Sequence, residues 1–395
     1  MAKYKLGDIC EIVSGSTPKT SIPEYWDGEI KWITPAELND DTYIVADSVR
    51  KITELGVQKT GLSPFPSGTV ILSSRAPIGK VAIAGCEMYC NQGFKNLICS
   101  DVINNRYLFW FLKGNSVLLN SLGRGATFKE ISKQIVGDIE INVPDMSEQL
   151  QAVERFEKIR RIILLRKKQL AELDNLIKAR FVEMFGHPVS NEMNWSQVPL
   201  AACIDSIDNG KSFVCDTTAR QGNWPAVLKL SAATYGFYRP EENKAMLDDR
   251  LFLEDAAVRA GDLLFTRKNT PELVGMCAYV YNTPQKLMMP DLIFRLNTTT
   301  DCNKIFLWKL INHDFFRERI QSIATGSAKS MSNISKERLL GLTIILPPIK
   351  LQEQFAAFVE QVDKSKVAEA THTLCTLFNI ILNGGTRYDI RTNEF

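Results

Sequence analysis

Arginine, lysine and amide side chains gather in several loops that follow predicted strands. These residue types bind nucleic acid, because they reach the edges of bases and neutralise phosphates. In the first half of the chain the candidate nucleic-acid contacts are Arg75, Lys80, Gln92, Lys95, Arg124, Thr127 and Lys129. In the second half they are Lys229, Arg267, Lys268, Asn269, Lys329 and Ser330. Each alone is equally compatible with a solvated surface charge, but their recurrence in matching loops favours a binding function.

The motifs that would indicate catalysis are missing from the sequence. It contains neither the G-x-x-x-x-G-K-[ST] phosphate loop nor the Asn-Pro-Pro-aromatic motif that an amino-methyltransferase uses to hold its target amine. His187, His313 and His372 are far apart and have no cysteine or carboxylate neighbour suited to a nucleophile pair. We therefore expect no catalytic residues and no cofactor in this chain.

Composition limits the class of protein. A length of 395 residues fits two or three domains, and 45% hydrophobic with 23% charged residues is usual for a soluble globular protein. The nine cysteines are scattered without C-x-x-C spacing, so we expect free thiols and no metal site. No stretch has the length and apolar character of a membrane span or a secretory signal, which predicts a cytoplasmic protein.

The candidate loops belong to an internal repeat. EISKQIVGDIEINVPDMSEQ (130–149) is echoed by NISKERLLGLTIILPPIKLQEQ (333–354), with Ser132 and Ser335 203 positions apart. Each copy reads as a strand of alternating apolar residues that ends at a proline, followed by Glu-Gln and the start of a helix. Upstream, 67–85 and 260–280 share a looser pattern of glycine turn, strand, basic loop and second strand. The greater divergence there indicates that the two units bind different targets.

Each repeat ends in a long helix with an apolar stripe, which predicts that the two helices pair as an antiparallel coiled coil. Unrelated surface helices are the weaker alternative. About 30 paired residues, each rising about 1.5 Å, would give a rod of roughly 45 Å. That rod would exceed one turn of duplex DNA, which is about 34 Å. The helix-pairing candidates are Phe156, Ile159, Ile163, Leu170, Leu173, Ile177, Phe355, Phe358, Val362, Leu374 and Leu377.

The order of these segments, together with WDGEIKWITPAEL (26–38), SSRAPIGKVAI (73–83) and ARFVEMFGHP (179–188), resembles the specificity subunits of type I restriction–modification enzymes. The resemblance covers nearly the whole chain. It implies an α+β fold of two similar mixed α/β target recognition domains, separated by two antiparallel helices and related by a pseudo-two-fold axis. The expected divisions are recognition domains at 1–145 and 195–346, spacer helices at 146–185 and 347–382, a linker at 186–194 and an irregular tail at 383–395.

The resemblance also implies a function and partners. Such a subunit reads a bipartite target in double-stranded DNA, with one half-site per recognition domain. It binds methyltransferase (M) subunits, expected to be two, and through them restriction (R) subunits. S-adenosylmethionine and ATP are expected on those partners. The tail GGTRYDIRTNEF (384–395) departs from the first repeat at ARFVEMFG, which weakens the expectation for contacts made by the end of the second helix. The alternative is a protein-binding scaffold or a regulatory DNA-binding protein built from a duplicated domain.

Overall fold

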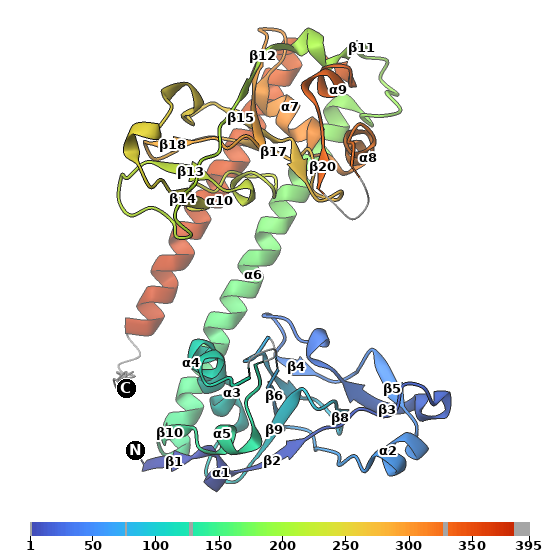
Figure 1. Cartoon of the computed structure of the whole chain (residues 1–395), viewed down its shortest axis with the longest axis vertical. Helices are drawn as coiled ribbons and strands as arrows, with labels where there is room; N and C mark the ends of the chain where they lie inside the picture. The colour runs from blue at the N-terminus through green and yellow to red at the C-terminus, as the bar shows by residue number, and fades with distance from the viewer. Residues whose placement is uncertain (1, 76, 126–128, 327–330, 383–395) are drawn as a thin grey trace. The chain divides into compact units, whose positions relative to one another are not determined.

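The computed structural model describes the chain except residues 1, 76, 126–128, 327–330 and 383–395, together with the side chains of 367–382. The chain divides into two compact units, built around residues 1–164 and 165–375. Each unit combines short mixed sheets with helices (Figure 1). In the part of the chain that the structure describes, no helix is both long enough and apolar enough to span a bilayer.

The first unit contains three sheets. The largest has the order β2-β9-β6-β7-β4, and a second has the order β5-β3-β8. The third pairs β1 with β10 in antiparallel register, so the two ends of the unit's chain meet. The strands are β1 (Ala2–Lys5), β2 (Cys10–Ser14), β3 (Trp26–Ile33), β4 (Ile44–Val45), β5 (Arg50–Ile52), β6 (Val70–Ser73), β7 (Val81–Ala84), β8 (Tyr89–Cys90), β9 (Phe94–Cys99) and β10 (Glu140–Val143).

Helices cover the largest sheet of this unit and complete its core. Strands β6 and β7 are buried at every position, since side chains pack on both of their faces. The aromatic side chains of Phe109 and Tyr107 on α3 are buried in that core, as expected for apolar residues at helical spacing. The helices are α1 (Leu6–Ile9), α2 (Glu54–Thr60), α3 (Asn105–Gly114), α4 (Ser116–Ser121) and α5 (Lys133–Gly137).

The second unit repeats this architecture. Its sheets have the orders β12-β19-β15-β17, β14-β13-β18 and β11-β21, and a short pair joins β16 to β20. The strands are β11 (Ser196–Pro199), β12 (Ile204–Asn209), β13 (Ala226–Leu228), β14 (Asn243–Ala245), β15 (Leu263–Thr266), β16 (Lys268–Asn269), β17 (Cys277–Tyr279), β18 (Leu287–Met288), β19 (Ile293–Thr298), β20 (Ser332–Asn333) and β21 (Thr343–Leu346). The helices are α7 (Lys304–Ile311), α8 (Asp314–Ser322) and α9 (Lys336–Leu340).

The correspondence extends to strand direction. In the first unit β3 pairs antiparallel with β5 and parallel with β8. In the second, β13 pairs antiparallel with β14 and parallel with β18. The predicted α+β fold of two similar mixed domains is therefore confirmed at the level of sheet topology.

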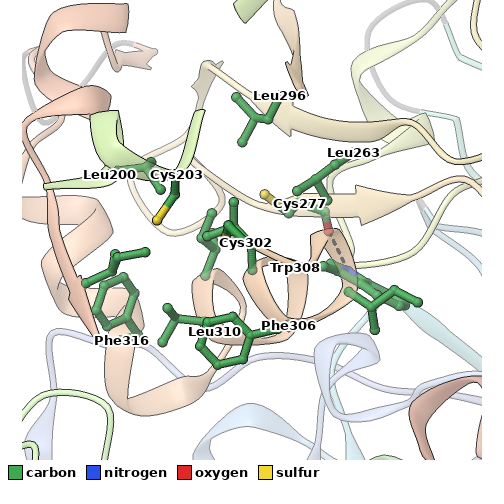
Figure 2. Close-up of a cluster of buried hydrophobic side chains, with 14 of the residues drawn as sticks. Leu200, Cys203, Leu263, Cys277, Leu296, Cys302, Phe306, Trp308, Leu310 and Phe316 are labelled. Atoms are coloured by element: carbon green, nitrogen blue, oxygen red, sulfur yellow. Dashed lines mark hydrogen bonds between the residues drawn. The ribbon is translucent and has the colours of Figure 1, made fainter. Parts of the chain in front are cut away.

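The core of the second unit is closed by aromatic and sulfur side chains (Figure 2). Cys203, Cys277 and Cys302 are buried and free, as the sequence predicts for scattered thiols. Trp308 donates its indole N–H to the carbonyl oxygen of Cys277 at 3.2 Å, so the polar edge of this ring is satisfied inside the core (Figure 2).

The doubled motif forms the same junction in both units. Ser132 and Ser335 cap α5 and α9, each accepting a 3.2 Å hydrogen bond from the backbone N–H three residues later. Pro144 follows the end of β10 and Pro347 follows the end of β21. A long helix then begins in each unit, α6 (Met146–Phe185) in the first and α10 (Ile349–Leu382) in the second.

One buried glutamine fixes the start of each long helix. Gln149 accepts from the backbone N–H of Asn104 at 2.8 Å and donates to the carbonyl of Pro144 at 3.0 Å. Gln352 does the same with Asn303 at 2.9 Å and Pro347 at 2.7 Å. The structure corrects the alignment made from sequence, in which Glu-Gln at 353–354 matched 148–149, because the residue equivalent to Gln149 is Gln352.

The long helices contact each other inside the second unit. Phe181 of α6 packs edge-on against Phe355 of α10, with ring centroids 5.4 Å apart. The Lys366 ammonium lies 2.5 Å from the carboxylate of Asp174. The contacting residues have rising residue numbers along α10 and falling residue numbers along α6. This part of the helix pair is therefore antiparallel, as predicted (Figure 1).

The remaining helix-pairing candidates have different environments. Ile177 and Val362 are buried in the second-unit core, where Leu173 and Phe358 pack at its edge. Phe156 instead stacks on Trp110 of the first unit, with centroids 5.4 Å apart, because the start of α6 covers that domain. Ile163 and Leu170 remain 38% and 36% exposed, and Ile159 is half-buried. The side chains of Leu374 and Leu377 lie outside the described residues.

Candidate nucleic-acid interface

Glu130 organises the basic residues of the first unit. Its carboxylate accepts from Arg75 Nε at 2.9 Å and from Lys95 Nζ at 3.3 Å. Burial opposes ionisation of this carboxyl, but the hydrogen bonds from the two cations outweigh it and lower the pKa of Glu130. The carboxylate therefore stays charged and fixes both cations in one place.

The candidates of this cluster differ in access to solvent. The Arg75 side chain is 45% exposed, so its free guanidinium edge can bind an anion. Lys95 is only 7% exposed, and its ammonium forms an ion pair with the Glu130 carboxylate. Lys80 donates to the carbonyls of Pro35 and Leu38 at 3.0 and 2.6 Å. The geometry gives Lys80 and Lys95 positioning roles in the free protein.

Four further candidates belong to the first unit, and the structure describes three of them. Arg124 and Lys129 are exposed, and the backbone of Arg124 bridges that of Glu130 through two hydrogen bonds of 3.0 and 2.9 Å. Gln92 is exposed and accepts a hydrogen bond from the Thr17 hydroxyl. Thr127 lies outside the described residues.

The second unit presents Arg267 beside Lys268, whose pairing with Asn333 corresponds to that of Arg75 with Glu130. The Arg267 guanidinium donates to Asn333 Oδ1 from Nη2 at 3.1 Å and lies 4.9 Å from the centre of the Phe294 ring. Lys336 donates to the carbonyl of Ile207 and lies 5.7 Å from the same ring. Arg267 is thus held by an amide rather than by a carboxylate, so its charge is not neutralised by Asn333.

The other candidates of this unit also differ in exposure. Lys268 and Lys229 are half-buried. Asn269 is 7% exposed and donates to Thr234 Oγ1 at 3.1 Å. Asn269 therefore holds the basic loop against its own unit, and does not face solvent in the free protein. Lys329 and Ser330 lie outside the described residues.

Backbone pairing within each unit shows which residues of the two clusters occupy equivalent positions. Arg75 bridges Glu130 in the first unit, and Lys268 pairs with Asn333 in the second. The residue before each cation accepts a backbone hydrogen bond through its carbonyl: Ile131 to Ser74 at 2.9 Å, and Ile334 to Arg267 at 2.8 Å. Each unit thus presents a basic loop from an equivalent backbone position, with different side chains.

These sites have the chemistry of anion binding and hydrogen-bonded recognition. Among the described residues, no group of three or more His, Cys, Asp or Glu side chains could hold a metal ion. The groups that the structure brings together are guanidinium, ammonium and amide groups on loops, which suit phosphates and base edges.

Residues 1–175 match the family model described as the type I restriction modification DNA specificity domain. The first part of the chain thus matches the DNA specificity domain of this family, and the curated relatives that match the chain are specificity subunits of type I restriction enzymes. The MjaIX specificity subunit of Methanocaldococcus jannaschii is 38% identical over 193 residues, which are 48% of this chain and 45% of that relative. The chain thus spans less than half of that relative's length in the match.

Other specificity subunits match over more of the chain. The MjaVIII specificity subunit of the same archaeon is 22% identical over 91% of this chain and 85% of its own length. The fold matches the S subunit of a type I system from M. genitalium with a TM-score of 0.50 and 13% identity. That match covers 97% of this chain and 93% of the other. A chain from a solved structure on complex assembly and conformational transition of the type I R-M system matches with a TM-score of 0.52 and 16% identity. That match covers 97% of this chain and 95% of the other.

Two features of the candidate interface were missed from sequence. Glu130 and Asn333 hold the basic loops, yet neither was recognised from sequence. They occupy equivalent positions of the repeat but differ in chemistry, one a carboxylate and the other an amide. Gly15 and Gly210 were also missed. A Cβ on either would lie 2.0 Å from the Cys90 carbonyl oxygen or 2.2 Å from that of Met289, so only glycine fits. The signal was in SGSTP (14–18) and NGKSF (209–213), glycine loops that each follow a strand.

Proposed function

We propose that this chain is the sequence-reading subunit of a type I restriction–modification complex. One unit would bind each half-site of a bipartite target in double-stranded DNA. The observation that carries the proposal is the pair of basic loops presented from equivalent backbone positions of two duplicated units. Their shared backbone suits one mode of docking, and their different side chains suit two different half-sites.

The proposal gives the chain no chemical step of its own. It would bind methyltransferase subunits, two per complex, and through them restriction subunits. S-adenosylmethionine and ATP would bind to those partners, which would methylate adenine or cut the DNA. The complex would act in the cytoplasm. The matches to the DNA specificity domain and to specificity subunits support this division of labour.

The long helices would set the distance between the half-sites. Support comes from α6, a helix of 40 residues that carries core side chains of the first unit at its start and of the second unit at its end. Because a helix rises about 1.5 Å per residue, its length would fix how many bases between the two half-sites are left without contact.

Sequencing methylated bases in cells tests the proposal. The chain is expressed with its cognate methyltransferase subunit in a host that lacks other adenine methylation. We expect a methylated motif of two short specified segments separated by a fixed unspecified gap. Methylation that is absent or unrelated to sequence would contradict the proposal and favour a protein-binding scaffold.

A further inference from the structure

Each unit carries a second exposed polar side chain at an equivalent loop position, and the two differ in chemistry. These residues are Gln92, which follows β8, and Asp291, which follows β18. Three anchors, two of backbone hydrogen bonds and one of side-chain contact, establish their equivalence without reference to sequence similarity.

The first anchor lies just before each residue. The N–H of Ser16 donates to the carbonyl of Cys90 at 3.1 Å. In the second unit the N–H of Lys211 donates to the carbonyl of Met289 at 3.0 Å. Gly15 and Gly210 make these approaches possible, as described above. The loop after the first strand of each sheet therefore crosses tightly over the loop that carries Gln92 or Asp291.

The second anchor lies just after each residue. The N–H of Ser74 donates to the carbonyl of Gly93 at 2.8 Å, and that of Arg267 to Leu292 at 3.0 Å. The next residues along the chain are the cations Arg75 and Lys268. Each polar residue thus sits beside the basic loop of its own unit.

The third anchor is the side-chain contact itself. The hydroxyl of Thr17 donates to Gln92 Oε1. The hydroxyl of Ser212 donates to Asp291 Oδ1. A hydroxyl from the crossing loop therefore orients both side chains. Among the described residues, no ion pair involves Asp291, and only its Oδ1 accepts a hydrogen bond, which leaves Oδ2 available.

We infer that Gln92 and Asp291 are base-reading residues of the two units. The inference rests on the proposed function and names two determinants of its specificity. A glutamine amide donates and accepts at once, which matches the N7 and N6 edge of adenine. A carboxylate only accepts, which matches the N4 amino group of cytosine, and it repels phosphates. The first unit therefore specifies an adenine at this position and the second a cytosine.

Two isosteric substitutions with opposite expected results test the inference. Gln92→Glu removes the donor, so one position of the first half-site should change from adenine to cytosine. Asp291→Asn adds a donor, so one position of the second half-site should change from cytosine to adenine. Asn retains an acceptor for Ser212, which preserves the loop. The base preference at the affected position should shift by about 5- to 150-fold, the range of one bidentate contact.

The readout is the methylated motif of the chain expressed with its methyltransferase subunit. Asp205→Asn is the matched control, an exposed aspartate at the edge of the same unit, whose motif should equal that of the wild type. A wild-type motif in two segments that neither substitution alters would overturn the inference alone. Weaker methylation with unchanged base preference would also overturn it, because it indicates a merely structural role. A wild type without a two-segment motif would instead refute the proposed function.

Discussion

Two buried glutamines, Gln149 and Gln352, connect each recognition unit to its helix. They are 1% and 0% exposed, and each side chain bonds three backbone groups from two segments of its unit. The backbone groups concerned are buried beside proline, which lacks an N–H and cannot supply a replacement. The repeated motif therefore includes a structural junction between each unit and its long helix.

Gln352→Ala should lower the free energy of unfolding by about 1–3 kcal/mol, because it leaves buried backbone groups without partners. Chemical denaturation of the full chain measures this loss. Gln354→Ala is the control: Gln354 is exposed on the same helix, and its loss should change the free energy by no more than about 0.5 kcal/mol. Equal effects of the two substitutions would contradict the assigned junction.

Residue-level prediction from sequence was uneven for a physical reason. The capping serines and the strand-ending prolines were found because backbone geometry demands those residue types. Lys95 and Asn269 were selected for their chemistry, but the structure buries both, since a loop residue can face its own unit. Asp291 was overlooked because an acid is not expected beside phosphates, although it suits a cytosine.

At the scale of elements, α6 and α10 form an apolar seam inside the second unit. Phe181 is fully buried and contacts Phe355, Phe306 and His313 at ring-centroid distances of 5.4, 5.8 and 5.1 Å. The helices therefore belong to the core of the domain they adjoin. The heptad pattern predicted the pairing of these helices, but it could not reveal that Phe156 packs on a domain, because both environments select apolar residues at the same spacing.

Phe181→Ala should destabilise the second unit by about 3–5 kcal/mol, since it removes a ring from a closed core and leaves a cavity. Hydrogen exchange of the amides of α7 and β15 measures the effect on that unit. Leu176→Ala changes a residue of the same helix that is 48% exposed, and it should alter exchange little. Unchanged protection in Phe181→Ala would show that the helix is not part of the core.

At the scale of the whole molecule, duplication explains the organisation of the chain. The strand order β2-β9-β6-β7 recurs as β12-β19-β15-β17, and each copy of the unit ends in a long helix. The repeat was visible in the sequence because the junction residues are fixed by backbone geometry. The loops diverge because they are free to change without loss of fold, so the sequence alone could not identify which loop residues correspond.

The most direct test of the account exchanges residues 1–145 for the corresponding unit of another specificity subunit and determines the methylated motif of the chimera. We predict that one half-site changes to that of the donor, while the other half-site and the gap stay as they were. A motif that is unchanged, or one in which both half-sites change together, would contradict the claim that each unit reads its own half of the target.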